Sequence, residues 1–212
     1  MHVVIVTSML RPVRDHTVFA TSTRIEQTEH TIKTAREKIQ GCYIVMVDGG
    51  FMTDQEKNLF GSLVDHLHHV DVTKLNKSPG EATILHTYLT SSHFQRLENV
   101  ETVSKLSGRY YLNDNFNWDT LPMDKFIIAI IHVAWMGKPL YKTRYYRIPR
   151  DGIQYFIDGL KRYIDSWEFA VSWPDIEHCF HYHNIVKHDE VYCPDKLGVC
   201  GLITGSNELV ED

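Results

Sequence analysis

Short apolar runs alternate with helix-like patterns along the first part of the chain. His2 to Thr7 and Cys42 to Asp48 are apolar, β-branched runs typical of buried strands. Between them, apolar positions recur at helical spacing from about 24 to 40, after a capping-box pattern at Thr23-Arg24-Ile25-Glu26. A second capping box, Thr53-Asp54-Gln55-Glu56, predicts a helix that runs toward Val70.

This β-α-β-α order predicts a parallel sheet with helices on its faces, because parallel strands need a crossover connection. Further along, the pattern predicts helices at 80–94 and 153–167, strands at 100–106, 126–132 and 138–147, a short His-rich helix after Asp175, and a strand-like segment at 197–204. No internal repeat or linker interrupts the pattern. We therefore expect one α/β domain over residues 1–212, with a mixed, mainly parallel, Rossmann-like central sheet flanked by helices.

The net charge of the chain excludes some classes of binding partner. The chain has 22 Lys and Arg against 27 Asp and Glu, a formal charge of −5, and no basic run, so nucleic acid and anionic membranes are not expected partners. No stretch has 18 uninterrupted apolar residues, and the amino terminus lacks a secretion-signal pattern, which predicts a cytoplasmic protein without a membrane span. The four cysteines form no CxxC pair and are interpreted as reduced thiols.

Polar residues follow the predicted strands, where parallel sheets bind their ligands. Asp48, in VMVDGG, is placed to accept hydrogen bonds from a nucleobase or a ribose; the alternative is an Asp that bonds its own turn. Lys77 precedes a helix start at Gly80-Glu81, and both the ammonium group and a helix amino terminus favour a phosphate. The alternative there is a capped turn with a solvated lysine.

The segment SKLSGRYY brings Arg109 directly after a strand and a glycine. Its guanidinium group could pair with a diphosphate or with an internal carboxylate. Asn113, Asp114 and Asn115 follow with oxygen atoms suited to Mg²⁺ or Mn²⁺. The alternative is a β-hairpin with its aromatic side chains in the core.

The stretch from Trp173 to His183 is dense in titratable groups. Glu177 or Asp175 is a candidate general base, whereas the alternative role of Asp175 is to cap a helix. A zinc site from His178, Cys179, His181 and His183 is disfavoured, because no zinc-binding motif frames them.

Taken in order, these segments resemble nucleotide-sugar glycosyltransferases of the GT-A fold. VDGGFMTD is similar to the VDDGSxD element with which many of these enzymes hold the nucleotide base. KLSGRYYLNDNF, IEHCFHYHNI and LGVCGLITGS resemble signatures of a smaller group found in polysaccharide-synthesis clusters and in large DNA viruses, including chlorella virus enzymes that build capsid glycans. The resemblance implies a GT-A-like fold, a UDP-sugar donor and Mn²⁺ or Mg²⁺. The donor-binding residues that it implies are Thr7, Asp48, Lys77, Gly80, Glu81, Lys105, Ser107, Gly108 and Arg109.

One departure from the family pattern affects the metal. Ser107-Gly108-Arg109 stands where GT-A enzymes usually carry an Asp-x-Asp motif. Either Arg109 takes over part of the charge neutralisation, or Asp114, His181 or His183 holds the ion.

The resulting hypothesis is an enzyme that transfers a hexose or deoxyhexose, of glucose or rhamnose type, from a UDP-sugar to a glycan acceptor. Glu177 and Asp175 are its predicted catalytic residues, and it could be one of several catalytic domains in a longer parent chain. A rival hypothesis is a non-catalytic glycan- or nucleotide-binding module that uses the aromatic and basic stretch 141–147 as a stacking surface. A third, a metal hydrolase, would use the His-rich tail.

Overall fold

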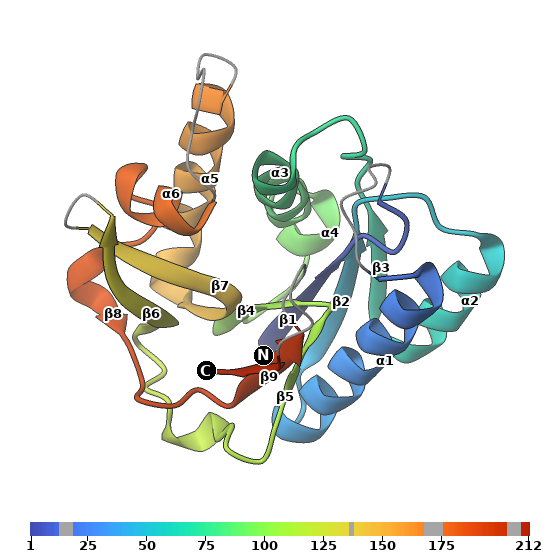
Figure 1. Ribbon diagram of the computed structural model, residues 1–212, viewed down its shortest axis with the longest axis horizontal. Coiled ribbons are helices and arrows are strands. Elements are labelled where there is room, and N and C mark those ends of the chain that lie inside the picture. Colours follow the sequence, from blue (N-terminus) through green and yellow to red (C-terminus); the bar gives the residue numbers. More distant parts are fainter. Residues whose placement is uncertain (13–18, 136–137, 168–175, 203–208) are drawn as a thin grey trace.

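The architecture follows from a computed structural model that describes residues 1–12, 19–135, 138–167, 176–202 and 209–212. In this part of the chain the central sheet has seven strands in the order β3-β2-β1-β4-β7-β6-β8 (Figure 1). Their bounds are β1 His2–Ser8, β2 Tyr43–Asp48, β3 His66–His69, β4 Thr102–Ser107, β6 Phe126–Trp135, β7 Lys138–Pro149 and β8 Val191–Tyr192. β7 runs antiparallel to β4 and β6, and the other neighbouring strands pair in parallel. The predicted mixed, mainly parallel α/β sheet is confirmed.

Helices cover both faces of this sheet (Figure 1). They are α1 Thr21–Lys38, α2 Asp54–Leu63, α3 Lys77–Leu89, α4 Ser92–Gln95, α5 Ile153–Trp167 and α6 Ile176–Tyr182. Val3 and Ile5 of β1 belong to a core cluster with residues of α3, α5 and α6, whereas Val4 and Val6 belong to a second cluster with residues of α1 and α2. Alternate residues of one strand therefore bury themselves on opposite faces, as a doubly covered sheet requires.

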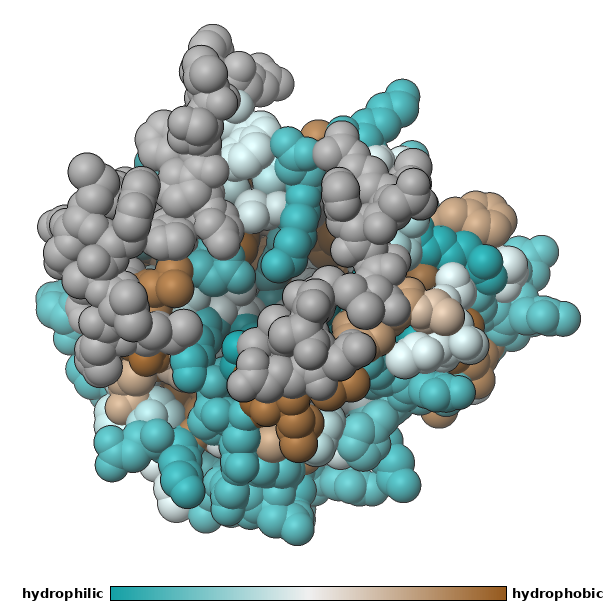
Figure 2. All heavy atoms as spheres, viewed as in Figure 1, coloured by the Kyte–Doolittle hydropathy of each residue, from teal (hydrophilic) through white to brown (hydrophobic). Residues whose placement is uncertain are grey.

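A small second sheet, not predicted from the sequence, packs against α1. It joins β5 Tyr110–Leu112, β9 Val199–Leu202 and β10 Leu209–Glu211 in the antiparallel order β10-β9-β5. Thr31 of α1 donates a hydrogen bond to the carbonyl of Tyr110 at 2.7 Å, which ties the helix to this sheet. On the face seen in Figure 2, hydrophobic residues appear as small separate groups among hydrophilic ones.

Several local predictions hold. The helix expected at 153–167 is α5, and the Thr53 capping box is present, with Thr53 accepting from the Glu56 amide and Glu56 accepting from the Thr53 amide. None of the helices in the described residues combines the length and apolar character of a membrane span.

Other local predictions are wrong. The capping box at Thr23 does not exist, because α1 begins earlier, with Ala20 as its N-cap and a bond from the Arg24 amide to the Ala20 carbonyl. The helix predicted to approach Val70 ends at Leu63, and His66–His69 instead pair with β2 as strand β3. Strand pairing thus overrides the local helical pattern.

Candidate functional site

The site lies where the order of the central strands reverses. The chain moves from β1 outward to β2 and β3, then returns to add β4 on the other side of β1. Thr7 and Ser107 are paired residues near the carboxyl ends of β1 and β4. Open α/β sheets bind their ligands at such a reversal, because the connections leave in opposite directions and open a crevice.

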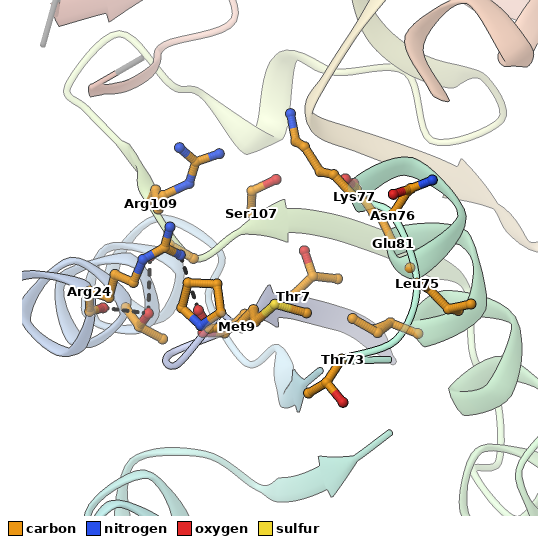
Figure 3. A pocket seen from close by; sticks show the side chains of 16 residues that line it. Thr7, Met9, Arg24, Thr73, Leu75, Asn76, Lys77, Glu81, Ser107 and Arg109 are labelled. Atoms are coloured by element: carbon orange, nitrogen blue, oxygen red, sulfur yellow. Dashed lines mark hydrogen bonds between the residues drawn. The ribbon is translucent and has the colours of Figure 1, made fainter. Parts of the chain in front are cut away.

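A cavity of about 550 Å³ occupies this position. It is lined by the carboxyl ends of β1 and β4, the start of α1, the segment before α3, and the first turns of α3 (Figure 3). The lining residues are Thr7, Ser8, Met9, Pro12, Arg24, Thr28, Thr73, Leu75, Asn76, Lys77, Gly80, Glu81, Ile84, Ser107, Gly108 and Arg109. Of the nine predicted donor-binding residues, Asp48 and Lys105 are missing from this set.

Gly108 allows the two strand ends and α1 to meet. Its amide donates to the Thr7 carbonyl at 2.8 Å, and its own carbonyl accepts from the Thr28 hydroxyl at 3.1 Å. A Cβ at this position would lie 3.0 Å from the Thr28 hydroxyl oxygen and 3.2 Å from the Thr7 carbonyl oxygen. A side chain here would therefore push apart the residues that form the floor of the pocket.

Two arginines face the pocket from one side. Arg24 donates from Nη1 to the Met9 carbonyl at 3.0 Å, but its Nε is buried and has no hydrogen-bond partner among the residues that the structure describes. Within the same residues, Nη1 of Arg109 is also buried without a partner. Burial and, to a lesser extent, the charge of Arg109 lower the pKa of Arg24 to about 10, so it stays protonated at neutral pH. Unsatisfied buried donors on two neighbouring cations are the electrostatic complement of an anion.

Sequence reasoning missed Arg24, although a local signal exists. The first turn of a helix disfavours cations because of the helix dipole, and α1 has no acidic residue there to compensate for Arg24. A cation at this place is explained by a ligand better than by helix stability.

The opposite side of the pocket is the amino-terminal part of α3 (Figure 3). Asn76 is its N-cap, and Lys77, Gly80 and Glu81 line the cavity with it. The amino end of this 13-residue helix adds partial positive charge to that of the Lys77 ammonium group. Apolar side chains of Met9, Leu75 and Ile84, with Pro12, complete the lining and provide a surface against which a flat ring can pack.

Asp48 lies outside the cavity and has the alternative role, that of an aspartate that bonds its own turn. Its side chain is fully buried, with Oδ1 accepting from the Gly50 amide at 2.9 Å and Oδ2 from the Leu10 amide at 3.0 Å. Burial raises the pKa of Asp48, although these hydrogen bonds oppose the rise. Asp48 therefore joins the loops after β1 and β2 and supports the pocket wall at Met9 indirectly.

Lys105 is also outside the cavity, beneath its wall. Its side chain is 1% exposed, and its ammonium group is fully engaged by three protein acceptors, so it does not reach a ligand.

Of the two predicted catalytic carboxylates, Asp175 lies outside the described residues. Glu177, in the first turn of α6, accepts a hydrogen bond from the Thr143 hydroxyl at 3.2 Å and does not line the cavity. The Thr143 carbonyl accepts from Lys105 at 2.6 Å, so Glu177 lies close to the group under the pocket wall.

The predicted metal ligands are not brought together. Asp114 is fully exposed and paired with Lys38, at the last residue of α1, at 2.7 Å. The ring of His183 packs on Tyr163 with centroids 5.4 Å apart, and burial lowers the pKa of His183. Among the described residues, no three His, Cys, Asp or Glu side chains form a group that could hold a metal ion. This includes the predicted set of Asp114, His181 and His183. The side chains of His178 and Cys179 lie outside the described part.

The stretch 141–147 offers no stacking surface. Tyr141, Tyr145, Tyr146 and Arg147 are all at most 2% exposed. The rings belong to the core, so a binding module could not use this stretch as its stacking surface.

Comparison with protein-family models and with curated proteins finds no match for this chain.

Proposed function

We propose that this chain is a UDP-sugar-dependent glycosyltransferase that moves a hexose or deoxyhexose, of glucose or rhamnose type, to a glycan acceptor in the cytoplasm, as in viral capsid glycan synthesis. The observation that carries the proposal is the pair of arginines with unsatisfied buried donors, Arg24 and Arg109, at the strand reversal of a Rossmann-like sheet. A diphosphate can pair with both guanidinium groups and cancels their mutual repulsion. The kind of sugar and the kind of acceptor in this proposal are inferred from the motifs that resemble GT-A enzymes.

The pocket suits the two ends of such a donor. Its apolar side chains, Met9, Leu75 and Ile84, fit the face of a uracil ring, and its volume of about 550 Å³ lies in the range usual for small-molecule sites. Lys77 and the amino end of α3 add to the positive charge that the arginines provide.

Transfer forms a bond between an acceptor hydroxyl oxygen and the anomeric carbon, while the bond from that carbon to the phosphate oxygen breaks. The electron pair stays with UDP, so negative charge grows on the diphosphate. Arg24 and Arg109 would stabilise that charge in the transition state, because both line the pocket in which it develops. The resemblance also implies Mn²⁺, but the residues predicted to hold it do not form a site, so no step is assigned to an ion.

The hydroxyl proton needs an acceptor, and we assign this role to Glu177. Its carboxylate lies beside Thr143, next to the Lys105 and Glu81 end of the site. Glu177→Gln should lower turnover by roughly 10²- to 10⁴-fold and leave UDP affinity unchanged, because Glu177 does not line the nucleotide pocket.

Isothermal titration with UDP, GDP and CMP, each with and without Mn²⁺, tests the proposal. We expect UDP to bind best, and the Mn²⁺ arm measures how much a divalent cation adds to the charge of the arginines. Slow release of glucose from UDP-glucose without acceptor would support an enzyme. Binding of free sugars without any binding of nucleotides would contradict the proposal.

A further inference from the structure

A charged lysine is buried beneath the pocket wall. The Lys105 side chain is 1% exposed, and its Nζ donates to Glu81 Oε1, to Ser107 Oγ at 2.6 Å and to the Thr143 carbonyl at 2.6 Å. An ammonium group has three N–H donors, and all three are used. Each acceptor comes from a different element: α3, the end of β4, and β7.

Stability alone does not explain this lysine. Removing an ion pair from water costs about as much as the pair regains, and apolar residues of similar size are often at least as stable. Burial lowers the pKa of Lys105, while the charge of Glu81 opposes the change. The arrangement is explained if the groups bound by the lysine have a use in the pocket.

Two of those groups line the pocket. Glu81 keeps 16% of its side chain exposed, and within the described residues its Oε2 has no hydrogen-bond partner. Ser107 accepts from Lys105, which leaves its own hydroxyl hydrogen to donate elsewhere. Lys105 therefore fixes an acceptor, Glu81, and a donor, Ser107, in the same wall. A sugar hydroxyl needs this combination, because it donates one hydrogen bond and accepts others.

The charges also orient a ligand. Arg24 and Arg109 lie on one side of the pocket and Glu81 on the other, with Ser107 between them (Figure 3). The two arginines attract the phosphates to their side of the pocket. On the other side Lys105 offsets the charge of Glu81, and Lys77 adds positive charge, so Glu81 Oε2 is left to accept from a hydroxyl-bearing part of the ligand.

We propose that Glu81 and Ser107 bind a hydroxyl of the transferred sugar, and that Lys105 is the positioning residue that holds both in place. This inference rests on the proposed function, since it assumes a nucleotide-sugar donor. It assigns to Glu81 a contact with the sugar, separate from the contacts of the arginines with the diphosphate.

Titrations of UDP and UDP-glucose into the parent and three variants test the inference. Glu81→Gln should weaken UDP-glucose about tenfold or more and leave UDP within about twofold, because the sugar alone loses a charged acceptor. Lys105→Met should show the same selective loss although Lys105 touches no ligand. Glu101→Gln is the matched control, since Glu101 pairs with the chain amino terminus at the other end of β4 and should change neither affinity.

Lys105→Met leaves Glu81 without its partner and could prevent folding. The double variant Lys105→Met/Glu81→Met removes both charges and should fold, bind UDP like the parent and lack the gain from the sugar. The inference is overturned if UDP binds and no variant changes the ratio of the two affinities, or if both ligands weaken equally; the proposed function then stands. If the parent binds neither ligand, both proposals fall.

Discussion

Replacing Arg24 with glutamine should separate a ligand-binding arginine from a structural one. Without ligand, Arg24→Gln loses one hydrogen bond, from Nη1 to the Met9 carbonyl, worth about 0.5–1.5 kcal/mol. It also removes the repulsion between Arg24 and Arg109, which acts in the opposite direction. The two effects offset each other, so the melting temperature of the ligand-free protein should change by less than about 3 °C.

Binding should respond much more strongly. A charge-assisted hydrogen bond to a phosphate contributes about 1.5–3 kcal/mol, or roughly 10- to 150-fold in Kd. Because the Arg24 side chain is only half-buried, solvent screens part of this energy, and we expect a loss near tenfold. Arg109→Lys should also weaken UDP although it keeps the charge, since the planar fork of the guanidinium group is lost.

The assay combines calorimetric titration of UDP with thermal unfolding of the ligand-free protein. Arg36→Gln is the control on the same helix, because Arg36 pairs with Asp65 at 2.9 Å and binds two carbonyls outside the pocket. It should lower the melting temperature and leave the Kd of UDP unchanged. If Arg24→Gln behaves like Arg36→Gln, with unchanged affinity and a lower melting temperature, Arg24 is a structural residue and not a ligand-binding one.

Three further predictions concern stability. Thr53→Ala removes the capping box of α2 and should cost about 1 kcal/mol in the free energy of unfolding, measured by urea denaturation. Gly198→Ala should cost about 2 to 5 kcal/mol, since Gly198 has φ +74° and a Cβ there would overlap the backbone nitrogen of Phe116; unchanged stability would contradict this packing. His66 and His93 stack with ring centroids 3.5 Å apart, and burial lowers the pKa of each below the usual 6.5. As the pH falls, the two imidazole groups are protonated at a higher pH in the unfolded chain than in the folded chain. Their contribution to the free energy of unfolding should therefore be fully present above about pH 6.5 and be lost as the pH drops through the folded-state pKa values. His66→Gln should flatten this dependence in urea denaturations across pH.

Side-chain patterns within a few residues were enough to predict some of the helices and strands and some of the pocket residues. The helix at 153–167 and the capping box at Thr53 could be predicted because both depend on side chains a few residues apart. Arg109 could be proposed because it follows a predicted strand, and strand ends meet at one edge of a parallel sheet. Lys77 could be proposed because it precedes a predicted helix start, where a phosphate is favoured.

Tertiary structure alone decided which of these side chains line the pocket. Asp48 and Lys105 stand in the predicted motifs, yet protein partners that are distant in sequence, Leu10 and Thr143, take up their hydrogen bonds. Arg24 lines the pocket because α1 packs against the carboxyl end of β4, where Thr28 of α1 donates to the Gly108 carbonyl. Burial and charge balance depend on neighbours across the sheet, and one-dimensional spacing contains no information about those neighbours. The pattern of the chain therefore determined the α/β sheet and the edge at which the pocket lies, while packing determined which charged groups at that edge lack a partner among the described residues.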